Sequence, residues 1–295
     1  MKENTRKATS LSAAYAGAIS LGGDLTVNRL GFGAMRLTGE GIWGPPRDRA
    51  ASIAVLRRAV ELGVNFIDTA DSYGPNVSEE LIAEALAPYP KDLVIATKGG
   101  WNRPGPNQWT HDASPAHLRE AVEGSLKRLR LERIDLYQLH VPDPVVPLDA
   151  SIETLANMRS EGKIRLVALS NVTVEHIDRA RKIVPIVSVQ NRYSFADREW
   201  DNVVDYCERN GIAFIPWFPL GAGTVAGRLL EKIAKTRGVK PIQIALSWLL
   251  KRSPIMLPIP GTSSIVHLEE NVQAASLQLS ESEYLQLTGV AESAA

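Results

Sequence analysis

The stretch DLVIATKGG (92–100), followed by helical residues and then by IDLYQLH (134–140), decides the fold class of this 295-residue chain. Both runs are short and largely apolar, which is typical of strands that are buried on both faces. Between them, Ser114 and Pro115 are residue types that favour the first positions of a helix. A strand, a helix and a second strand in this order predict a parallel βαβ unit.

The same alternation recurs along most of the chain. Upstream, a helix with Ile53, Leu56 and Val60 on one face ends at Gly63, and VNFIDTA (64–70) follows it as a strand. Downstream, helical and apolar segments continue to alternate. The predicted helices cover 148–161, 173–183, 198–210 and 241–251, and the predicted strands are IRLVALS (164–170), VSVQ (187–190), IAFIPW (212–217) and IMLPIP (255–260).

About eight strands with intervening helices favour an α/β fold, a (β/α)8 TIM barrel, as a single domain over 14–295. The residues 14–35 predict short strands around the turn Gly22-Gly23-Asp24, either as a separate hairpin or as the start of the sheet. A doubly wound open sheet is the alternative, but LGFGAM (30–35) is only a partial match to the GxGxxG fingerprint of such sheets. We expect residues 1–13 to form a disordered tail.

Composition restricts the possible partners. The chain has 33 basic and 33 acidic residues, so no excess of positive charge predicts binding to nucleic acid or to an acidic membrane. No apolar run approaches the roughly 20 residues that span a bilayer, and polar residues interrupt the N-terminal stretch where a signal peptide needs an apolar core. The single cysteine, Cys207, excludes an intrachain disulfide and fits a reducing compartment. We therefore expect a cytoplasmic protein, a monomer or weak homo-oligomer, whose partner is a small molecule.

Four polar residues, Asp68, Tyr73, Lys98 and His140, lie at or just after the ends of predicted strands, the rim where α/β barrels form active sites. A free tyrosine has a pKa of about 10, so an enzyme that uses one as an acid near neutral pH must stabilise its phenolate. Lys98 is a cation that can do this, Asp68 can hold the lysine, and His140 can position a substrate oxygen. Taken singly, each of the four fits a bland role, such as a turn cap or a surface charge. Together they predict an enzyme that protonates a carbonyl oxygen.

Three stretches carry a family resemblance: FIDTADSYG (66–74), ATKGG (96–100) and LKRLRLERIDLYQLH (126–140). They resemble the signature sequences of the aldo-keto reductases, and the similarity continues in order from about residue 25 to 292. The resemblance implies an eight-stranded barrel whose N-terminal hairpin closes the bottom. It also implies an NAD(P)H-dependent carbonyl reductase with Tyr73 as general acid, Lys98 and Asp68 as the groups that tune it, and His140 as the residue that orients the carbonyl.

The resemblance also implies where the nicotinamide half of the cofactor binds. The residues expected to contact the nicotinamide lie around the C-terminal mouth of the barrel. Gly33, Ala34 and Met35 match the loop under the nicotinamide ribose, Asp68 lies beside them, Ser170, Asn171 and Gln190 match the groups that bond the carboxamide, Trp217 replaces the stacking tyrosine or phenylalanine, and Phe218 and Leu220 follow in the same loop.

The adenosine half is expected after the last strand, in IPGTSSIVHLEEN (259–271). The hydroxyls of Thr262, Ser263 and Ser264 precede a predicted helix, where free backbone N–H groups suit a phosphate, although an ordinary helix cap would look the same. Many NADPH-specific relatives carry lysine and arginine where this chain has Gly261 and His267. We expect NADPH, with NADH left open. Glu270 and Asn271 match positions that contact the adenine.

Tryptophans in the predicted loops indicate an aromatic cleft for a flat or apolar aldehyde. Trp43, Trp101 and Trp109 are expected to border it, although a loop tryptophan also serves local packing. VNRLGFGAMRLTGEGIWGPPRDR (27–49) together with 259–271 is similar to a bacterial subgroup that includes pyridoxal reductases. Pyridoxal is therefore a candidate substrate beside small aldehydes, sugars and ketones.

Two other classes of function are considered. The same fold and cofactor site resemble the β-subunits of potassium channels, so a regulatory or redox-sensing NADPH-binding subunit is an alternative. A metal-dependent barrel hydrolase needs clustered histidines and carboxylates at strand ends. The five histidines of this chain are scattered along the sequence, so we expect no metal site; they are His111, His117, His140, His176 and His267.

Overall fold

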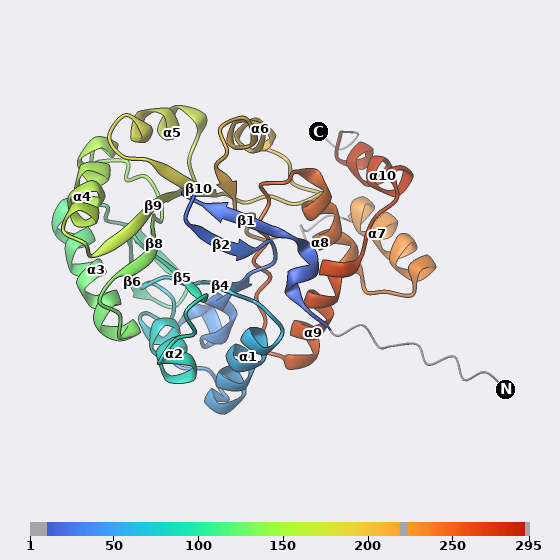
Figure 1. Ribbon diagram of the computed structural model, residues 1–295, viewed down its shortest axis with the longest axis horizontal. Helices are drawn as coiled ribbons and strands as arrows, with labels where there is room; N and C mark the ends of the chain where they lie inside the picture. Colours follow the sequence, from blue (N-terminus) through green and yellow to red (C-terminus); the bar gives the residue numbers. More distant parts are fainter. Residues whose placement is uncertain (1–10, 219–223, 293–295) are drawn as a thin grey trace.

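The computed structural model describes residues 11–218 and 224–292. At its centre, seven parallel strands form one curled sheet in the order β11-β10-β9-β8-β5-β4-β3 (Figure 1). The strands of this sheet therefore lie side by side in the order in which they occur along the chain, as successive βαβ crossovers of one hand produce. The strands are β3 (Phe32–Gly33), β4 (Phe66–Asp68), β5 (Val94–Gly99), β8 (Ile134–Leu139), β9 (Ile164–Ser170), β10 (Ile186–Gln190) and β11 (Ala213–Phe214).

Helices lie outside the sheet, as in a TIM-like barrel and unlike a doubly wound sheet (Figure 1). The helix cap expected at Ser114 is present: its side chain accepts a hydrogen bond from the N–H of His117 at the start of α3. In α1 the buried positions are Ser52, Val55, Leu56 and Ala59, one face of a helix. The α-helices are α1 (Arg49–Glu61), α2 (Val77–Leu86), α3 (Pro115–Leu129), α4 (Leu148–Ser160), α5 (Val174–Arg181), α6 (Asp201–Arg209), α7 (Thr224–Arg237), α8 (Pro241–Arg252), α9 (Ile265–Gln273) and α10 (Glu281–Glu292).

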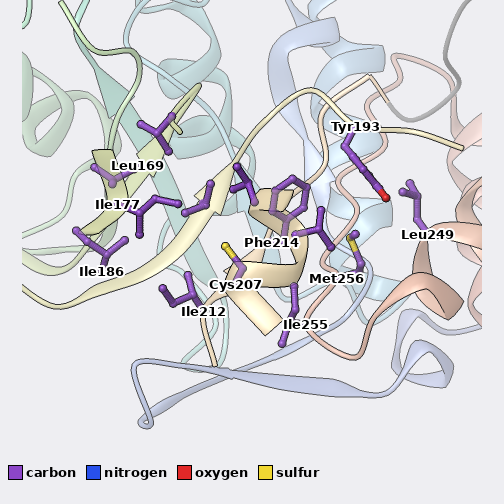
Figure 2. Close-up of a cluster of buried hydrophobic side chains, with 14 of the residues drawn as sticks. Leu169, Ile177, Ile186, Tyr193, Cys207, Ile212, Phe214, Leu249, Ile255 and Met256 are labelled. Atoms are coloured by element: carbon purple, nitrogen blue, oxygen red, sulfur yellow. The ribbon is translucent and has the colours of Figure 1, made fainter. Parts of the chain in front are cut away.

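Successive side chains of each strand enter different hydrophobic cores. Ala96 and Leu136 point into the curled sheet, whereas Ile95 and Tyr137 belong to the clusters between sheet and helices. Figure 2 shows part of the outer cluster, where Cys207 packs beside Phe214 and Ile212. The cysteine is fully buried, and burial raises its thiol pKa to about 12.

An antiparallel hairpin precedes the sheet, formed by β1 (Ala18–Leu21) and β2 (Leu25–Asn28). Its residues Leu21 and Val27 are fully buried and belong to the hydrophobic cluster inside the curled sheet. A second antiparallel hairpin, β6 (Trp101–Gly105) with β7 (Gln108–His111), occupies the segment that the sequence suggested to be a substrate loop.

The eighth predicted strand, 255–260, does not form a regular strand in the described part of the chain. It is nevertheless bonded on both sides: Phe214 N–H donates to Ile255 O at 2.9 Å, and Gly31 N–H donates to Pro258 O at 2.9 Å. Pro258 and Pro260 have no N–H, so the ladder cannot continue past a single bridge. The sheet therefore has seven strands where the sequence predicted about eight.

The N-terminal boundary differs from the expected one. Residues 1–10 of the expected tail lie outside the described residues. Ser12, however, caps the short 3-10 helix η1 (Ala13–Ala16), and the buried Ala13 donates its N–H to Leu62 O at 2.8 Å. None of the helices in residues 11–218 and 224–292 is long and apolar enough to cross a membrane.

Candidate functional site

The structure brings Asp68, Lys98, Tyr73 and His140 together at the carboxyl ends of three adjacent strands. Asp68 ends β4, Lys98 lies near the end of β5, and His140 directly follows β8. Parallel pairing places Asp68 opposite Ala96, and Lys98 opposite Gln138. Tyr73 comes from the loop between β4 and α2. All four side chains are buried, and Lys98 has no exposed surface.

The Lys98 ammonium group is the centre of this cluster. Its Nζ lies 2.5 Å from Asp68 Oδ1, 2.8 Å from the carbonyl oxygen of Thr69 and 3.3 Å from the hydroxyl of Tyr73. An ammonium has three donors, so all three are used here. The lysine is thereby fixed with one N–H directed to the phenol oxygen.

Asp68 is held from the opposite side by two glutamines. Gln138 Nε2 donates to Asp68 Oδ2 at 2.7 Å, and Gln190 Nε2 donates to the same oxygen at 2.8 Å. The sequence analysis did not identify Gln138, although it stands two residues before His140 on the same strand face. It placed Gln190 at the carboxamide, whereas the Nε2 of this residue is occupied by Asp68.

The histidine packs edge-on against the tyrosine. The rings of Tyr73 and His140 lie 5.8 Å apart at an angle of 81°. His140 Nδ1 is 3.5 Å from Ser72 Oγ, which leaves the other ring nitrogen without a partner in the described part of the chain. That nitrogen is available to a ligand beside the phenol.

Burial dominates the protonation of the cluster. It raises the pKa of Tyr73, against the opposing effect of the Lys98 charge, so the phenol is protonated near neutral pH. Burial alone would lower the pKa of Lys98, but Asp68 and Tyr73 outweigh it and raise that pKa. Burial, reinforced by the Lys98 charge, lowers the pKa of His140 well below its usual value. The site thus holds a neutral phenol, a charged lysine and a neutral imidazole.

The residues expected around the nicotinamide lie in one connected network beside these groups. Asn171 has φ 57° and donates from Nδ2 to the carbonyl oxygen of His140 at 3.0 Å. Its Oδ1 accepts the indole N–H of Trp217 at 3.3 Å. Ser170 Oγ donates to Gln190 O at 2.8 Å. The asparagine therefore ties the indole to the strand end that carries the histidine.

The other residues expected at the nicotinamide half of the cofactor have fewer side-chain contacts with the four central residues. Gly33 ends β3, and a Cβ there would lie 2.7 Å from Ile259 O, so the first loop and the last one touch. Ala34 and Met35 begin the 3-10 helix η2 (Ala34–Leu37). Phe218 is 42% exposed with φ 61°. Leu220 lies outside the described residues.

The segment expected to bind the adenosine half forms the start of α9. Ser264 Oγ accepts the N–H of His267 at 3.5 Å, and Thr262 Oγ1 accepts the N–H of Ser264 at 3.1 Å. Gly261 closely approaches the first loop, since a Cβ on it would lie 2.5 Å from Gly33 O. The backbone leaves no room there for a side chain. Ser263 lies in the same turn, between Thr262 and Ser264.

Charges on α9 are compatible with a phosphate. Glu269, an acidic residue of α9, forms an ion pair with Arg58 at 2.8 Å. Glu270 lies 3.8 Å from Lys240, and Asn271 is buried. Hydroxyl and amide donors at a helix start, with its acidic neighbours paired, fit the phosphate end of a dinucleotide.

Aromatic rings form a wall next to the histidine. Trp101 and Trp109 lie 6.4 Å and 6.5 Å from the ring of His140 and 5.9 Å from one another. His111 packs on Trp101 at 4.3 Å. Among the described residues, no group of three or more histidines, cysteines or carboxylates is arranged to hold a metal.

Comparison with known proteins assigns the class. The model of the aldo/keto reductase family matches residues 29–292, so the chain belongs to the aldo-keto reductases. The chain is 52% identical to an uncharacterized oxidoreductase of Schizosaccharomyces pombe over 285 residues, which cover 96% of this chain and 92% of that protein. It is 47% identical to pyridoxine 4-dehydrogenase of Escherichia coli over 275 residues, which cover 91% of this chain and 96% of that protein.

A solved relative adds the cofactor. An aldo-keto reductase from Klebsiella pneumoniae in complex with NADP and acetate superimposes with a TM-score of 0.77 at 26% identity, over 92% of this chain and 94% of that chain. The chain is accordingly an oxidoreductase of carbonyl groups, with NADPH as its cofactor. The hydroxyl-lined start of α9 and the Asn171–Trp217 network described above fit that cofactor.

Proposed function

We propose that the chain is a carbonyl reductase in which Tyr73 donates the proton to the substrate oxygen. The supporting observation is the position of Lys98 Nζ, 2.5 Å from Asp68 Oδ1 and 3.3 Å from the Tyr73 hydroxyl. A fixed cation beside a buried phenol stabilises the phenolate that forms when the proton leaves. The two glutamines on Asp68 keep the carboxylate from turning towards the phenol.

Each residue then has one role in the reaction. NADPH, when bound, supplies the hydride. Tyr73 holds the proton that the carbonyl oxygen receives, and Lys98 offsets the charge left on the phenol. His140 is neutral and has one ring nitrogen directed away from Ser72, so it can donate a hydrogen bond that positions the same oxygen. Burial of all four side chains excludes water from the proton transfer.

For the substrate we propose an aromatic aldehyde such as pyridoxal. The wall of Trp101, Trp109 and His140 rings suits a flat ring that stacks against it. The 47% identical relative is a pyridoxine 4-dehydrogenase, and oxidation of that alcohol yields an aldehyde of the proposed kind. The role of Trp43 as a further wall of the pocket belongs to the same proposal.

The cofactor residues and the closure of the sheet are part of the proposal. We assign the nicotinamide to the Asn171–Trp217 network and the adenosine phosphate to the turn at 261–264. We also assign segment 255–260 as the eighth member of the barrel, supported by its bonds to Phe214 and Gly31, with the β1–β2 hairpin covering the bottom. The buried, unreactive cysteine supports a cytoplasmic location.

The test is oxidation of NADPH and of NADH, followed by nicotinamide absorbance, against pyridoxal, 4-nitrobenzaldehyde and a small aliphatic aldehyde. We expect turnover with NADPH, faster for the two aromatic aldehydes. Dissociation constants for both nucleotides, measured by calorimetry, separate binding from chemistry. Tight NADPH binding without turnover of any carbonyl would refute the catalytic proposal and favour a nucleotide-sensing role.

A further inference from the structure

Arg103 is a buried cation that the proposed reaction does not use. It lies in β6, the first strand of the β6–β7 hairpin, and only 9% of its surface is exposed. No carboxylate of residues 11–218 and 224–292 pairs with it. Burial lowers the pKa of its guanidinium, but an arginine remains charged at any physiological pH. An isolated buried charge is costly unless other groups compensate it, so this residue requires an explanation.

Four backbone carbonyl oxygens surround the guanidinium. Nη1 donates to Ile42 O at 3.0 Å and to Ser72 O at 2.8 Å, and Nη2 donates to Gly41 O at 3.0 Å. Nε donates to Gln108 O at 2.9 Å across the hairpin. The single side chain therefore joins three segments that are far apart in sequence.

Two tryptophans lie against the same guanidinium. Its carbon lies 3.7 Å from the ring centre of Trp109 and 5.7 Å from that of Trp43. Trp109 in turn lies edge-on to His140 at 6.5 Å. The backbone around Trp43 is bonded to the loop after Tyr73, because Gly44 N–H donates to Gly74 O at 2.6 Å. Arg103 thus contacts both tryptophans while it holds the loop that precedes the tyrosine.

We propose that Arg103 is a positioning residue that sets the preference for flat aromatic aldehydes, because it fixes Trp43 and Trp109 as the walls of the substrate pocket. The inference rests on the carbonyl reductase function proposed above. It adds a specificity role for Arg103, whose guanidinium donates to four backbone oxygens and lies against two indole rings.

Only arginine satisfies both requirements. A planar guanidinium donates in its plane to several carbonyls and stacks with its faces on aromatic rings, whereas a lysine ammonium is a point charge with three donors. A lysine at this position would keep the charge but lose the stacking surface and part of the carbonyl bonds. The matched pair Arg103→Met and Arg103→Lys therefore separates charge from shape.

The experiment compares kcat/KM for 4-nitrobenzaldehyde with that for propanal, using NADPH, in wild type and in both variants. We expect Arg103→Met to lower the aromatic-to-aliphatic ratio by about tenfold or more, mainly through KM of the aromatic aldehyde, because the pocket walls lose their fixed positions. Arg103→Lys should lower the ratio by a smaller factor. The dissociation constant for NADPH should change by less than about twofold in both, since the cofactor residues are not in contact with Arg103.

Arg119→Met is the control, because the side chain of this half-exposed arginine of α3 bonds Glu161 alone among the described residues, at 2.9 Å. It should leave the selectivity ratio unchanged. An equal loss for both aldehydes in the Arg103 variants, or an unchanged ratio, would overturn the specificity role. If Arg103→Met does not fold, Arg103→Lys decides by the same ratio. Wild-type protein that turns over neither aldehyde would refute the proposed function itself, and with it this inference.

Discussion

An ion pair lies on each side of strand β5, and the two pairs differ in what surrounds them. On the inner face, Lys98 binds Asp68 at 2.5 Å. On the outer face, the neighbouring Thr97 donates from Oγ1 to Glu79 Oε1 at 2.6 Å, and Arg128 binds the second oxygen of Glu79 at 2.7 Å. Adjacent strand residues point to opposite faces, so the two pairs lie on either side of one strand.

Protein groups occupy both carboxylate oxygens of the outer pair, whereas the inner pair also contacts a group that can react. Both oxygens of Glu79 are occupied by protein groups, and Arg128 also contacts Ser125 at 3.4 Å. The inner lysine, in contrast, directs one donor to the hydroxyl of Tyr73, which faces the proposed substrate. The comparison indicates that a buried ion pair contributes to chemistry only where it touches a group that can exchange a proton. The outer pair joins α2 and α3 to the sheet and should act on stability alone.

Lys98→Met is expected to have the largest effect, because it removes both functions of the inner pair. Turnover should fall by about a thousandfold or more, since the phenolate loses its cation. Breaking a buried pair by removing one partner typically costs about 3–5 kcal/mol, so the unfolding midpoint in urea should fall as well. Steady-state kinetics and urea titration measure the two effects. Substantial residual activity would show that another group tunes the tyrosine.

Tyr73→Phe separates the chemistry of the inner pair from its structural part. We expect turnover to fall by about 10²–10⁴-fold, because the proton donor is lost and nothing else is removed. NADPH should bind with nearly unchanged affinity, and stability should change by about 1 kcal/mol. Calorimetry with NADPH and single-turnover kinetics check these points. Full turnover in this variant would exclude the tyrosine as the acid.

Glu79→Gln tests the outer pair. Removing its charge leaves Arg128 without a counter-charge, and because that arginine is 20% exposed, the expected loss of stability is about 2–3 kcal/mol, below the value for a fully buried partner. Activity per folded molecule should stay within about twofold of wild type, since no contact within the described residues joins the Glu79 side chain to the substrate side of β5. A large loss of kcat at unchanged stability would mean that the two faces of the strand are not independent.

The sequence predicted the inner pair but not the outer one, for a physical reason. Asp68, Tyr73, Lys98 and His140 stand at strand ends in long, specific motifs, and parallel strands necessarily bring such residues to one edge. Glu79 lies in α2 and Arg128 in α3, where charged residues are most often solvated, so only the packing of the two helices against Thr97 shows that Glu79 is buried and that the two residues pair. Arg103 was missed likewise, because its partners are backbone oxygens, which no side-chain motif encodes.

The limits of the sheet were predictable only in part. Most strand and helix segments follow from apolar periodicity, including the helices around β8 and β9. The segment 255–260 was expected to be a strand because it is apolar, but its two prolines restrict it to isolated bonds with Phe214 and Gly31. The apolar periodicity of a sequence shows which residues are buried. Pairing between strands also needs backbone N–H donors at alternate positions, which proline lacks.

The charges of both pairs influence Asp71. Its carboxyl group is buried, and Oδ1 has no hydrogen-bond partner in the part of the chain that the structure describes. Burial and the negative charge of Glu79 raise its pKa to about 8, against the opposing charges of Arg128 and Lys98. Asp71 is therefore largely protonated near neutral pH.

Asp71→Asn is expected to have the smallest effect, and one that depends on pH. The carboxyl ionises near pH 4 in the unfolded chain but at about pH 8 in the folded one, so the folded state binds more protons between these values. The stability contributed by the neutral form is fully present below about pH 4 and is lost as the pH rises through about 8. Asparagine does not titrate, so the variant should gain on wild type by about 1 kcal/mol between pH 7 and pH 8, measured by urea midpoints. A stability difference that is constant with pH would show that Asp71 is already ionised at neutral pH, and water would then have to reach its carboxyl group.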